Sequence, residues 1–424
     1  MSTSVESFQR VRSAPVRDGI DRFLRARVLA SLAPLQGGQL HLHDAFGDLL
    51  IGKLAEPSAV AATIRVHDMG FYRQVALNGS VGAGEAYMDG LWSCDDLVAL
   101  VRLLVRNRDL LDGMETGLAS LGMQAMRALH ALRNNTRRGS RRNIAAHYDL
   151  GNDFFSLFLD SNLMYSSAIF AEPSESLESA SVRKLDRICS RLELQAGDHL
   201  LEIGTGWGGM ALHAATRTGC RVTTTTISRE QHALASRRVH DAGLSDRVTV
   251  LLQDYRDLQG SYDKLVSIEM IEAIGHQYLD TYFGKCSSLL EPGGLALVQA
   301  ITIEDHRYQQ ALGSVDFIKR HVFPGSFIPC VSAIASSAAS AGQLRLAGLD
   351  DIGPSYALTL QHWRQRFLAR LDDVRAQGFD DRFLRMWEFY LCYCEGGFIE
   401  GAISDVQMLL AKPGQRRARS QSVT

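Results

Sequence analysis

The sequence predicts an α/β protein whose main domain is a doubly wound, mostly parallel sheet with helical insertions, and whose N-terminal part is a small α+β domain. One observation is a set of five short apolar runs that alternate with helical patterns, at residues 199–203, 221–226, 248–252, 264–268 and 296–301. Such alternation is typical of parallel strands with helices on both faces of a sheet. The other is the length of 424 residues with 46% apolar residues, which predicts two or three domains with cores of their own.

The N-terminal part has a different pattern. Residues 39–43, 48–51 and 62–66 are short alternating runs that indicate strands, and residues 71–77 indicate a helix. We therefore expect a small accessory domain over residues 1–125. From residue 314 onward the sequence is rich in aromatic residues, and we expect it to be mostly helical.

Two basic segments interrupt an otherwise balanced charge of 45 basic and 47 acidic side chains. Between residues 116 and 147 there is no Asp or Glu, but there are six arginines: Arg127, Arg133, Arg137, Arg138, Arg141 and Arg142. We interpret residues 126–145 as a basic linker and residues 413–424 as a basic flexible tail. The linker is either a solvated connector or a contact for an anionic phospholipid surface. Nucleic acid is the weaker partner, because no stacking platform or reading helix accompanies the arginines.

The spacing of the cysteines and the lengths of the apolar runs indicate the cellular compartment of the protein. Seven scattered cysteines form neither a disulfide framework nor a zinc pattern, so we expect a reducing, cytoplasmic environment and no metal. No apolar run approaches the roughly 20 residues that cross a bilayer. We therefore expect contact with a membrane to be peripheral.

A glycine-rich loop follows the first apolar run. Gly204, Gly206 and Gly209 also satisfy the pattern of dinucleotide-binding proteins, which requires an acidic residue about 20 positions later. The second run ends in threonines instead. Glu202, two residues before the first glycine, is the acid typical of S-adenosylmethionine-dependent methyltransferases, so that cofactor is favoured.

Several further motifs together resemble the cyclopropane-fatty-acyl-phospholipid synthase family. They are AHYDLGNDFF at 146–155, LFLD at 157–160, MYSSA at 164–168, the glycine loop, residues 226–231, 253–258 and 266–275, FPG at 323–325, and Tyr356 with Thr359, Leu360 and Trp363; residues 81–92, VGAGEAYMDGLW, resemble the family's N-terminal domain. The resemblance implies a Rossmann-like class I methyltransferase domain over residues 146–412. It also implies methyl or methylene transfer from S-adenosylmethionine to the double bond of an unsaturated phospholipid acyl chain, through a carbocation, at the inner face of the membrane. The product is then a cyclopropane or a mid-chain methyl or methylene fatty acid.

The resemblance also implies the residues around the cofactor: Tyr165, Ser166, Gly204, Gly206, Gly208, Thr226, Gln231, Asp254 and Tyr255. Without it, the glycines indicate only a tight strand-to-helix turn, which is compatible with binding. Thr226 then reads as a helix cap, and Gln231 as a residue on a helix surface.

The family's usual base is a bicarbonate ion held by a cysteine, a glutamate, a histidine and a tyrosine. Glu272 and Tyr356 match that pattern, whereas Ser167 stands at the cysteine position and Gln299 at the histidine position. Glu269 stands where the family usually has glycine, so we infer that its carboxylate fills the bicarbonate space. The base is then either this carboxylate or a bicarbonate ion.

The spacing of the two glutamates supports a shared site. A separation of three places Glu269 and Glu272 on one side of a helix start, where two close carboxylates raise one pKa. The alternative is that both merely oppose the helix dipole.

Other functions stay open. A methyltransferase acting on a soluble small molecule is the nearest alternative, and a lipid-binding protein without catalysis is a further one. The sequence leaves the oligomeric state open, a homodimer included.

Overall fold

The computed structural model describes residues 18–55, 57–110 and 150–414, which fold into two compact units. The first unit takes its described residues from 18–110, 313–324 and 360–402, and the second from 150–312, 325–359 and 403–414. Each unit thus combines segments that are far apart in sequence. The predicted linker and its boundaries at residues 125 and 145 lie outside the described residues.

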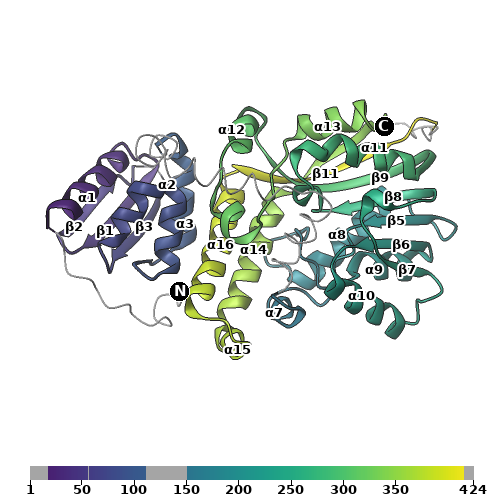
Figure 1. Ribbon diagram of the computed structural model, residues 1–424, viewed down its shortest axis with the longest axis horizontal. Coiled ribbons are helices and arrows are strands. Elements are labelled where there is room, and N and C mark those ends of the chain that lie inside the picture. The colour runs from purple at the N-terminus through teal and green to yellow at the C-terminus, as the bar shows by residue number, and fades with distance from the viewer. Residues whose placement is uncertain (1–17, 56, 111–149, 415–424) are drawn as a thin grey trace. The chain divides into compact units, whose positions relative to one another are not determined.

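The second unit is built on a seven-stranded sheet with the order β10-β11-β9-β8-β5-β6-β7 (Figure 1). The strands are β5 (His199–Ile203), β6 (Arg221–Thr226), β7 (Val248–Leu252), β8 (Tyr262–Ile268), β9 (Leu290–Ile303), β10 (Arg345–Asp351) and β11 (Ile403–Ala411). Strands β5 to β9 are parallel, which confirms the five predicted runs and the doubly wound sheet. Strands β10 and β11 are antiparallel, within a region that the sequence predicted to be mostly helical.

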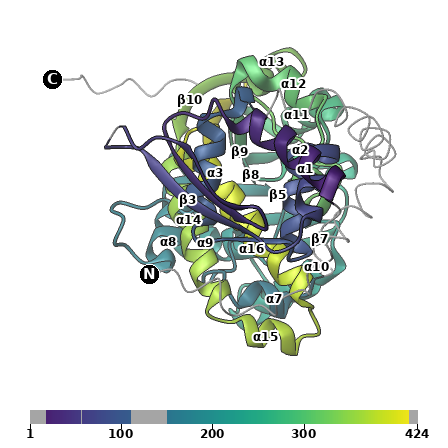
Figure 2. The ribbon, with the colours of Figure 1, turned by 90° about the vertical axis from the view of Figure 1, so that its left-hand side faces the viewer.

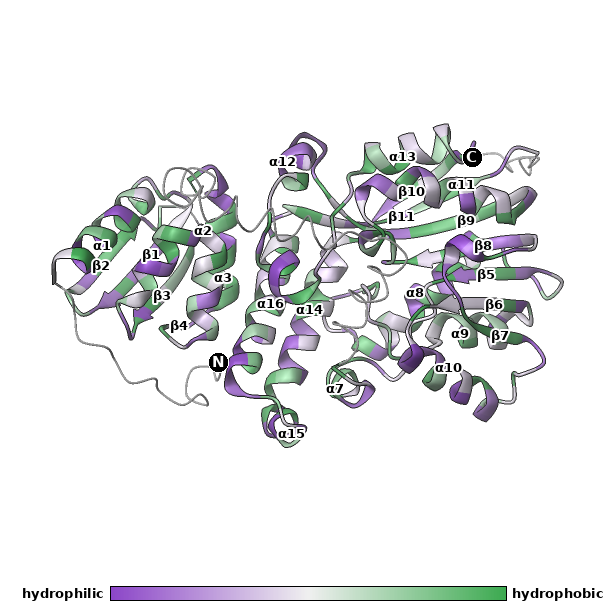
Figure 3. Ribbon diagram, viewed as in Figure 1, coloured by the Kyte–Doolittle hydropathy of each residue, from purple (hydrophilic) through white to green (hydrophobic). Residues whose placement is uncertain are grey.

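Helices cover both faces of this sheet. The helices of the second unit are α7 (Asn152–Ser156), α8 (Leu177–Arg191), α9 (Gly209–Thr218), α10 (Arg229–Asp241), α11 (Leu279–Leu289), α12 (Tyr308–Leu312), α13 (Val331–Ser340) and the first part of α14 (Gly353–Leu368). Leu200 of β5 packs in one apolar core with residues of α8 and α9. Its neighbour Leu201 packs in a second core with residues of α11 and α13. Because successive strand residues point to opposite faces, β5 buries a leucine on each face of the sheet (Figure 3).

The first unit contains a four-stranded sheet with the order β2-β1-β3-β4, whose strands are labelled in Figure 3. Figure 2 shows strand β3 of this sheet in a view turned by 90°. Its strands are β1 (Gly38–Asp44), β2 (Gly47–Gly52), β3 (Val60–Val66) and β4 (Trp92–Cys94), and its helices are α1 (Asp18–Leu32), α2 (Gly70–Met88), α3 (Leu97–Arg106), the end of α14, α15 (Leu371–Ala376) and α16 (Asp381–Ile399). The sequence predicted the first three strands and part of α2. Helix α16 contacts α2 and α3, and the Tyr87 hydroxyl of α2 donates a 2.8 Å hydrogen bond to Glu388 of α16.

No helix among residues 18–55, 57–110 and 150–414 is both long enough and apolar enough to cross a membrane. All seven cysteines are free thiols.

Candidate active site

The glycine loop leaves the carboxyl end of β5 in a conformation that only glycine adopts easily. Gly204, Gly206 and Gly208 have φ angles of 104°, 49° and 86°. A Cβ atom added to Gly206 would meet no atom within 4 Å, so the space in front of the loop is open. The amides of Gly204 and Thr205 both donate to the Thr225 carbonyl of β6, and these bonds hold the loop at the carboxyl ends of the parallel strands.

The segment before α8 lies against this loop. Trp207 donates through Nε1 to Asn152 Oδ1 at 2.6 Å, and Arg238 donates to the carbonyls of Asn162 and Trp207. The Phe155 ring lies 5.2 Å from the Tyr165 ring and 5.0 Å from the Trp207 ring, measured between centroids. The predicted residue Tyr165 is therefore next to the glycine loop.

The predicted residues after β6 are buried and joined to each other. The Thr226 hydroxyl donates to Gln231 Oε1 at 2.8 Å, while Ser228 caps α10 by accepting from the Gln231 amide. The alternative interpretation, in which Thr226 caps a helix and Gln231 lies on a helix surface and neither binds a ligand, is therefore wrong in its structural part. Ser228 is the cap, and the Gln231 side chain turns inward to meet Thr226.

Asp254 and Tyr255 follow β7 and lie at the same end of the sheet, where the parallel strands have their carboxyl ends. Arg256 holds the Asp254 carboxylate through Nε at 2.8 Å and Nη2 at 2.6 Å. The Tyr255 hydroxyl is buried and has no hydrogen-bond partner. Burial raises the pKa of Tyr255, so this hydroxyl keeps its proton as a donor.

The loop and its surroundings fit S-adenosylmethionine. Oε2 of Glu202 is buried without a hydrogen-bond partner, as is the Tyr255 hydroxyl, and the front of Gly206 is open. Burial raises the pKa of Glu202 to about 8. Unpaired buried polar atoms beside an open glycine turn at the carboxyl edge of a parallel sheet are what a polar nucleoside ligand requires. Tyr165, Ser166 and the glycines Gly204, Gly206 and Gly208 are the residues we expect to hold it.

Glu269 lies at the carboxyl end of β8, and three donors converge on its carboxylate. The Ser167 amide donates to Oε1 at 2.7 Å, and Gln299 Nε2 donates to the same oxygen at 2.8 Å. The Tyr356 hydroxyl donates to Oε2 at 2.7 Å. Four of the five residues that the sequence analysis named as catalytic therefore meet at this carboxylate. The Ser167 hydroxyl points elsewhere, to the Ala168 carbonyl, so Ser167 contributes its backbone.

The backbone of Glu269 is left-handed, with a φ of 47°. The expectation that Glu269 begins a helix together with Glu272 is therefore wrong, because the short 3₁₀ helix η2 spans Ile271–Ala273 and Glu269 precedes it. The Glu269 amide donates to the Gln299 carbonyl of β9 at 2.8 Å. A left-handed backbone costs a residue with a side chain roughly 1 kcal/mol, so the helix dipole does not explain Glu269.

Gln299 is itself held in one orientation. Its Nε2 also donates to Asp405 Oδ2 at 2.8 Å, and its Oε1 accepts from Gln407 Nε2 at 3.0 Å. Gln407 in turn accepts from Arg187 Nε at 3.1 Å. This chain of hydrogen bonds turns the NH2 group of Gln299 toward the carboxylates.

Glu272 is buried close to Glu269 but points to a different backbone group. Its Oε1 accepts from the Ile301 amide at 2.5 Å, and its Oε2 has no hydrogen-bond partner. Burial, and then the charge of Glu269, raise the pKa of Glu272 to about 8. Of the two carboxyl groups, Glu272 is therefore the one with the raised pKa, mainly because it is buried and in part because Glu269 is close.

Two buried charged residues here were not named from the sequence. Lys184 of α8 is fully buried, and its Nζ donates to Ser166 Oγ at 2.6 Å. Asp405 of β11 is also fully buried, and its pKa is raised by burial and by Glu269. The sequence signal for Lys184 was a lysine on the apolar face of an amphipathic helix. The signal for Asp405 was a pair of polar residues, Asp405 and Gln407, alternating within an apolar strand.

Comparison with known proteins identifies the family. The family model described as mycolic acid cyclopropane synthetase matches residues 135–408. The chain belongs to the cyclopropane synthase family. The tuberculostearic acid methyltransferase of Mycobacterium tuberculosis is 38% identical over 378 residues, 85% of each chain. The cyclopropane-fatty-acyl-phospholipid synthase of Escherichia coli is 37% identical over 347 residues, 81% of this chain and 86% of that one.

A solved relative carries the cofactor product. A mycolic acid cyclopropane synthase in complex with S-adenosylhomocysteine has a TM-score of 0.60 and 28% identity, covering 64% of this chain and 98% of its own. This cyclopropane synthase homologue is therefore a class I, S-adenosylmethionine-dependent methyltransferase, as the glycine loop predicted.

Proposed function

We propose that this protein transfers a methyl or methylene group from S-adenosylmethionine to the double bond of an unsaturated acyl chain in membrane phospholipid, and that Glu269 is its base. The lipid substrate is supported by the names of the relatives, which act on fatty acyl chains. S-adenosylmethionine supplies an electrophilic methyl group when it is bound. The π electrons of the alkene form the new carbon–carbon bond as the methyl–sulfur bond breaks, and a carbocation remains on the chain.

The base must then remove one proton. If it comes from the transferred methyl group, the C–H electrons close a cyclopropane ring. If it comes from a neighbouring chain carbon, they form a double bond and leave a methyl branch. A methylene branch forms when a 1,2-hydride shift first moves the cation to the carbon that bears the methyl group, and the proton is then lost from that methyl group. Each outcome needs a proton acceptor held rigidly beside the cation.

The observation that carries the proposal is the hydrogen bonding of Glu269. Its Oε1 accepts from Ser167 and Gln299, whereas Oε2 accepts from the Tyr356 hydroxyl. An ionised carboxylate has about four lone-pair positions, so Oε2 keeps one for an incoming proton. Ser167, Gln299 and Tyr356 are the positions that the family resemblance assigns to bicarbonate. We infer that the side chain of Glu269 replaces the ion.

Buried acids and a buried lysine surround Glu269. Glu272 and Asp405, the other carboxyl groups facing it, have raised pKa values, because burial and Glu269 favour their protonated forms. Lys184 lies within electrostatic range of both Glu269 and Glu202; burial lowers the pKa of this lysine, and the nearby carboxylates oppose that change. Tyr165 and Tyr356 offer aromatic faces that stabilise the sulfonium and the carbocation.

The test is expression in a bacterial host that lacks such activity, followed by mass spectrometry of its phospholipid fatty acids. We expect unsaturated chains to gain one CH2, and the products to remain in phospholipid. Catalytic hydrogenation then distinguishes a branched alkene, which takes up hydrogen, from a ring. Unchanged lipids, together with methylation of a soluble extract, would favour the small-molecule alternative.

We also propose that the substrate is reached at an anionic phospholipid surface on the cytoplasmic face. The arginines at 127–142 that suggested this contact lie outside the described residues, so the support is their charge alone.

A further inference from the structure

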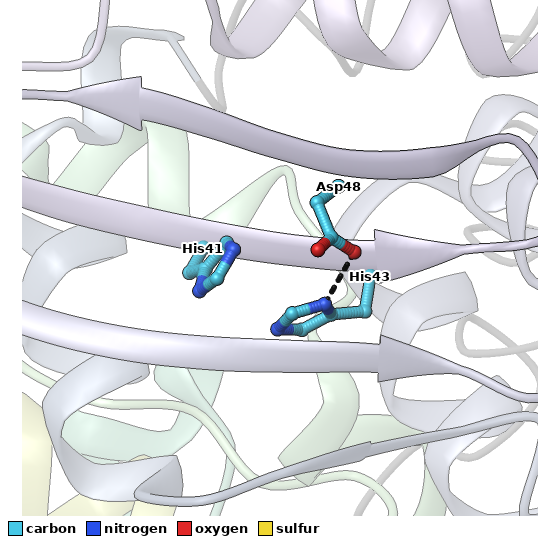
Figure 4. A group of neighbouring side chains, drawn as sticks. All are labelled: His41, His43 and Asp48. Atoms are coloured by element: carbon cyan, nitrogen blue, oxygen red, sulfur yellow. Dashed lines mark hydrogen bonds and ion pairs between the residues drawn. The ribbon is translucent and has the colours of Figure 1, made fainter.

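The outer face of the first unit's sheet brings two histidines and an aspartate together. His41 and His43 are two residues apart on β1, so both point away from the face that buries Leu40 and Leu42. Asp48 of the neighbouring strand β2 is paired directly with His43 in the antiparallel register. Figure 4 shows the three side chains converging on one side of the hairpin.

The distances match a group of metal ligands. One donor atom from each residue can be chosen so that all three lie within 4.8 Å of one another. The His41 and His43 rings have centroids 4.0 Å apart, and His43 Nδ1 donates to Asp48 Oδ1 at 2.6 Å. Ligand atoms around a tetrahedral zinc ion lie about 3.3 Å apart, given bond lengths of about 2.0 Å. Small side-chain rotations therefore suffice to close the three donors around a cation.

We propose that His41, His43 and Asp48 bind a divalent transition-metal ion such as Zn²⁺, Ni²⁺ or Cu²⁺. Two imidazoles with one carboxylate favour these ions over Mg²⁺ and Ca²⁺, which prefer oxygen ligands alone. The metal takes the place of the proton shared by His43 and Asp48: the Nδ1–H bond breaks, the proton leaves to solvent, and Nδ1 and the carboxylate each bond to the metal. Water completes the coordination.

The surroundings admit a cation from solvent. The side chains of His43 and Asp48 are 30% and 69% exposed, so the site is reached without unfolding. Arg65 of β3 is paired with His43 on the other side and is exposed, which leaves its guanidinium free to turn into water. Strand β2 is an edge strand of this sheet, and β1 is its interior neighbour. A metal ion bound by residues of both strands would therefore cross-link them.

This proposed site is separate in its residues from the methyltransferase chemistry and differs from the sequence-based expectation of no metal. That expectation rested on cysteine spacing. The sequence did contain a signal for such a site. Two histidines separated by one residue lie on a predicted strand, and Asp48 lies in the next predicted strand.

Titration calorimetry of the full chain, without a histidine tag, with ZnSO4 tests the proposal. We expect one ion per chain, and at least tenfold weaker binding in His41→Ala and in His43→Ala. Asp48→Asn should weaken binding by about 10- to 100-fold. The control is His67→Ala, because His67 directly follows β3 of the same sheet but contacts the Ser93 hydroxyl.

Electron paramagnetic resonance with Cu²⁺ provides a second readout that does not depend on activity. We expect hyperfine coupling to two imidazole nitrogens in the wild type and to one in each single histidine variant, whose circular dichroism should stay unchanged. Equal zinc affinity in the wild type, His41→Ala and His43→Ala would overturn the proposal, as would a Cu²⁺ spectrum that the two substitutions leave unaltered.

Discussion

The Tyr356 hydroxyl donates a 2.7 Å hydrogen bond to Oε2 of Glu269, and this bond joins α14 to the end of β8. It orients the carboxylate along a fixed direction, while Ser167 and Gln299 hold the other oxygen. Three hydrogen bonds, each contributing about 1 kcal/mol, are enough to offset the cost of the left-handed backbone at Glu269. Strain of this kind is maintained mainly at functional sites.

Cofactor binding depends on the bare glycine turn. Gly206→Asp should abolish binding of S-adenosylhomocysteine in calorimetric titration, because it strains the backbone at a φ of 49° and places a carboxylate in the open space before the loop. Gly204→Asp should do the same. The matched control is Gly197→Asp, since a Cβ at Gly197 also meets nothing within 4 Å and its φ is not left-handed. Unchanged affinity in a folded Gly206→Asp protein would remove the loop from the site.

The raised pKa of Glu272 predicts how stability changes with pH. Its pKa is about 8 in the folded state, against 4.5 when unperturbed, so the folded state holds this proton more tightly. The resulting stabilisation is present below about pH 4.5 and is lost as the pH rises through 8, by up to roughly 1.4 kcal/mol per unit. Glu272→Gln removes this dependence. We expect the thermal midpoint of the variant, relative to the wild type, to rise between pH 5 and pH 8, and a constant difference would contradict the assignment.

We expect Gln407 to affect the turnover rate, because its hydrogen bond orients the side-chain amide of Gln299. Gln407→Leu removes the donor to Gln299 Oε1 and should lower kcat about tenfold, with S-adenosylhomocysteine affinity unchanged. Gln407→Glu should be worse, because the new carboxylate attracts the NH2 group of Gln299 and turns its oxygen toward Glu269. Equal kcat values in the two variants would show that amide orientation is unimportant.

The arginine-rich segment predicts binding to anionic membranes. Replacing Arg137, Arg138, Arg141 and Arg142 by serine should reduce co-sedimentation with vesicles containing anionic phospholipid, by up to about 1 kcal/mol per arginine. Calorimetric binding of S-adenosylhomocysteine should stay intact. Sedimentation of the wild type that is equal at low and physiological salt would instead indicate a plain connector.

The sequence predicted the parallel sheet well, because strands buried on both faces are nearly continuous apolar runs such as 296–301. It missed β11, in which Asp405 and Gln407 break the apolar run, and β10, whose edge position leaves most of its residues exposed. The gathering of Ser167, Gln299 and Tyr356 around Glu269 followed from the family resemblance. The left-handed backbone of Glu269 did not, because a spacing of three residues is equally compatible with a helix.

The bicarbonate question has its own variant. Glu269→Gly introduces the residue that the family resemblance implies at this position, suits the left-handed φ of 47° and removes the carboxylate that we propose replaces the ion. We expect the variant to have little activity in degassed buffer and to regain part of it when bicarbonate is added. Ser167 and Gln299 should hold the ion weakly. No response to bicarbonate at any concentration would mean that the carboxylate does not occupy an ion site.

The turnover of Glu269→Gln, assayed on unsaturated phospholipid vesicles in bicarbonate-depleted buffer, tests the central claim most directly. The substitution keeps the size of the side chain but removes the acceptor for the substrate proton. We predict that wild-type turnover needs no added bicarbonate and that the variant loses roughly 10² to 10⁴ in kcat while binding S-adenosylhomocysteine normally. Normal turnover of Glu269→Gln under these conditions would contradict the assignment of Glu269 as the base.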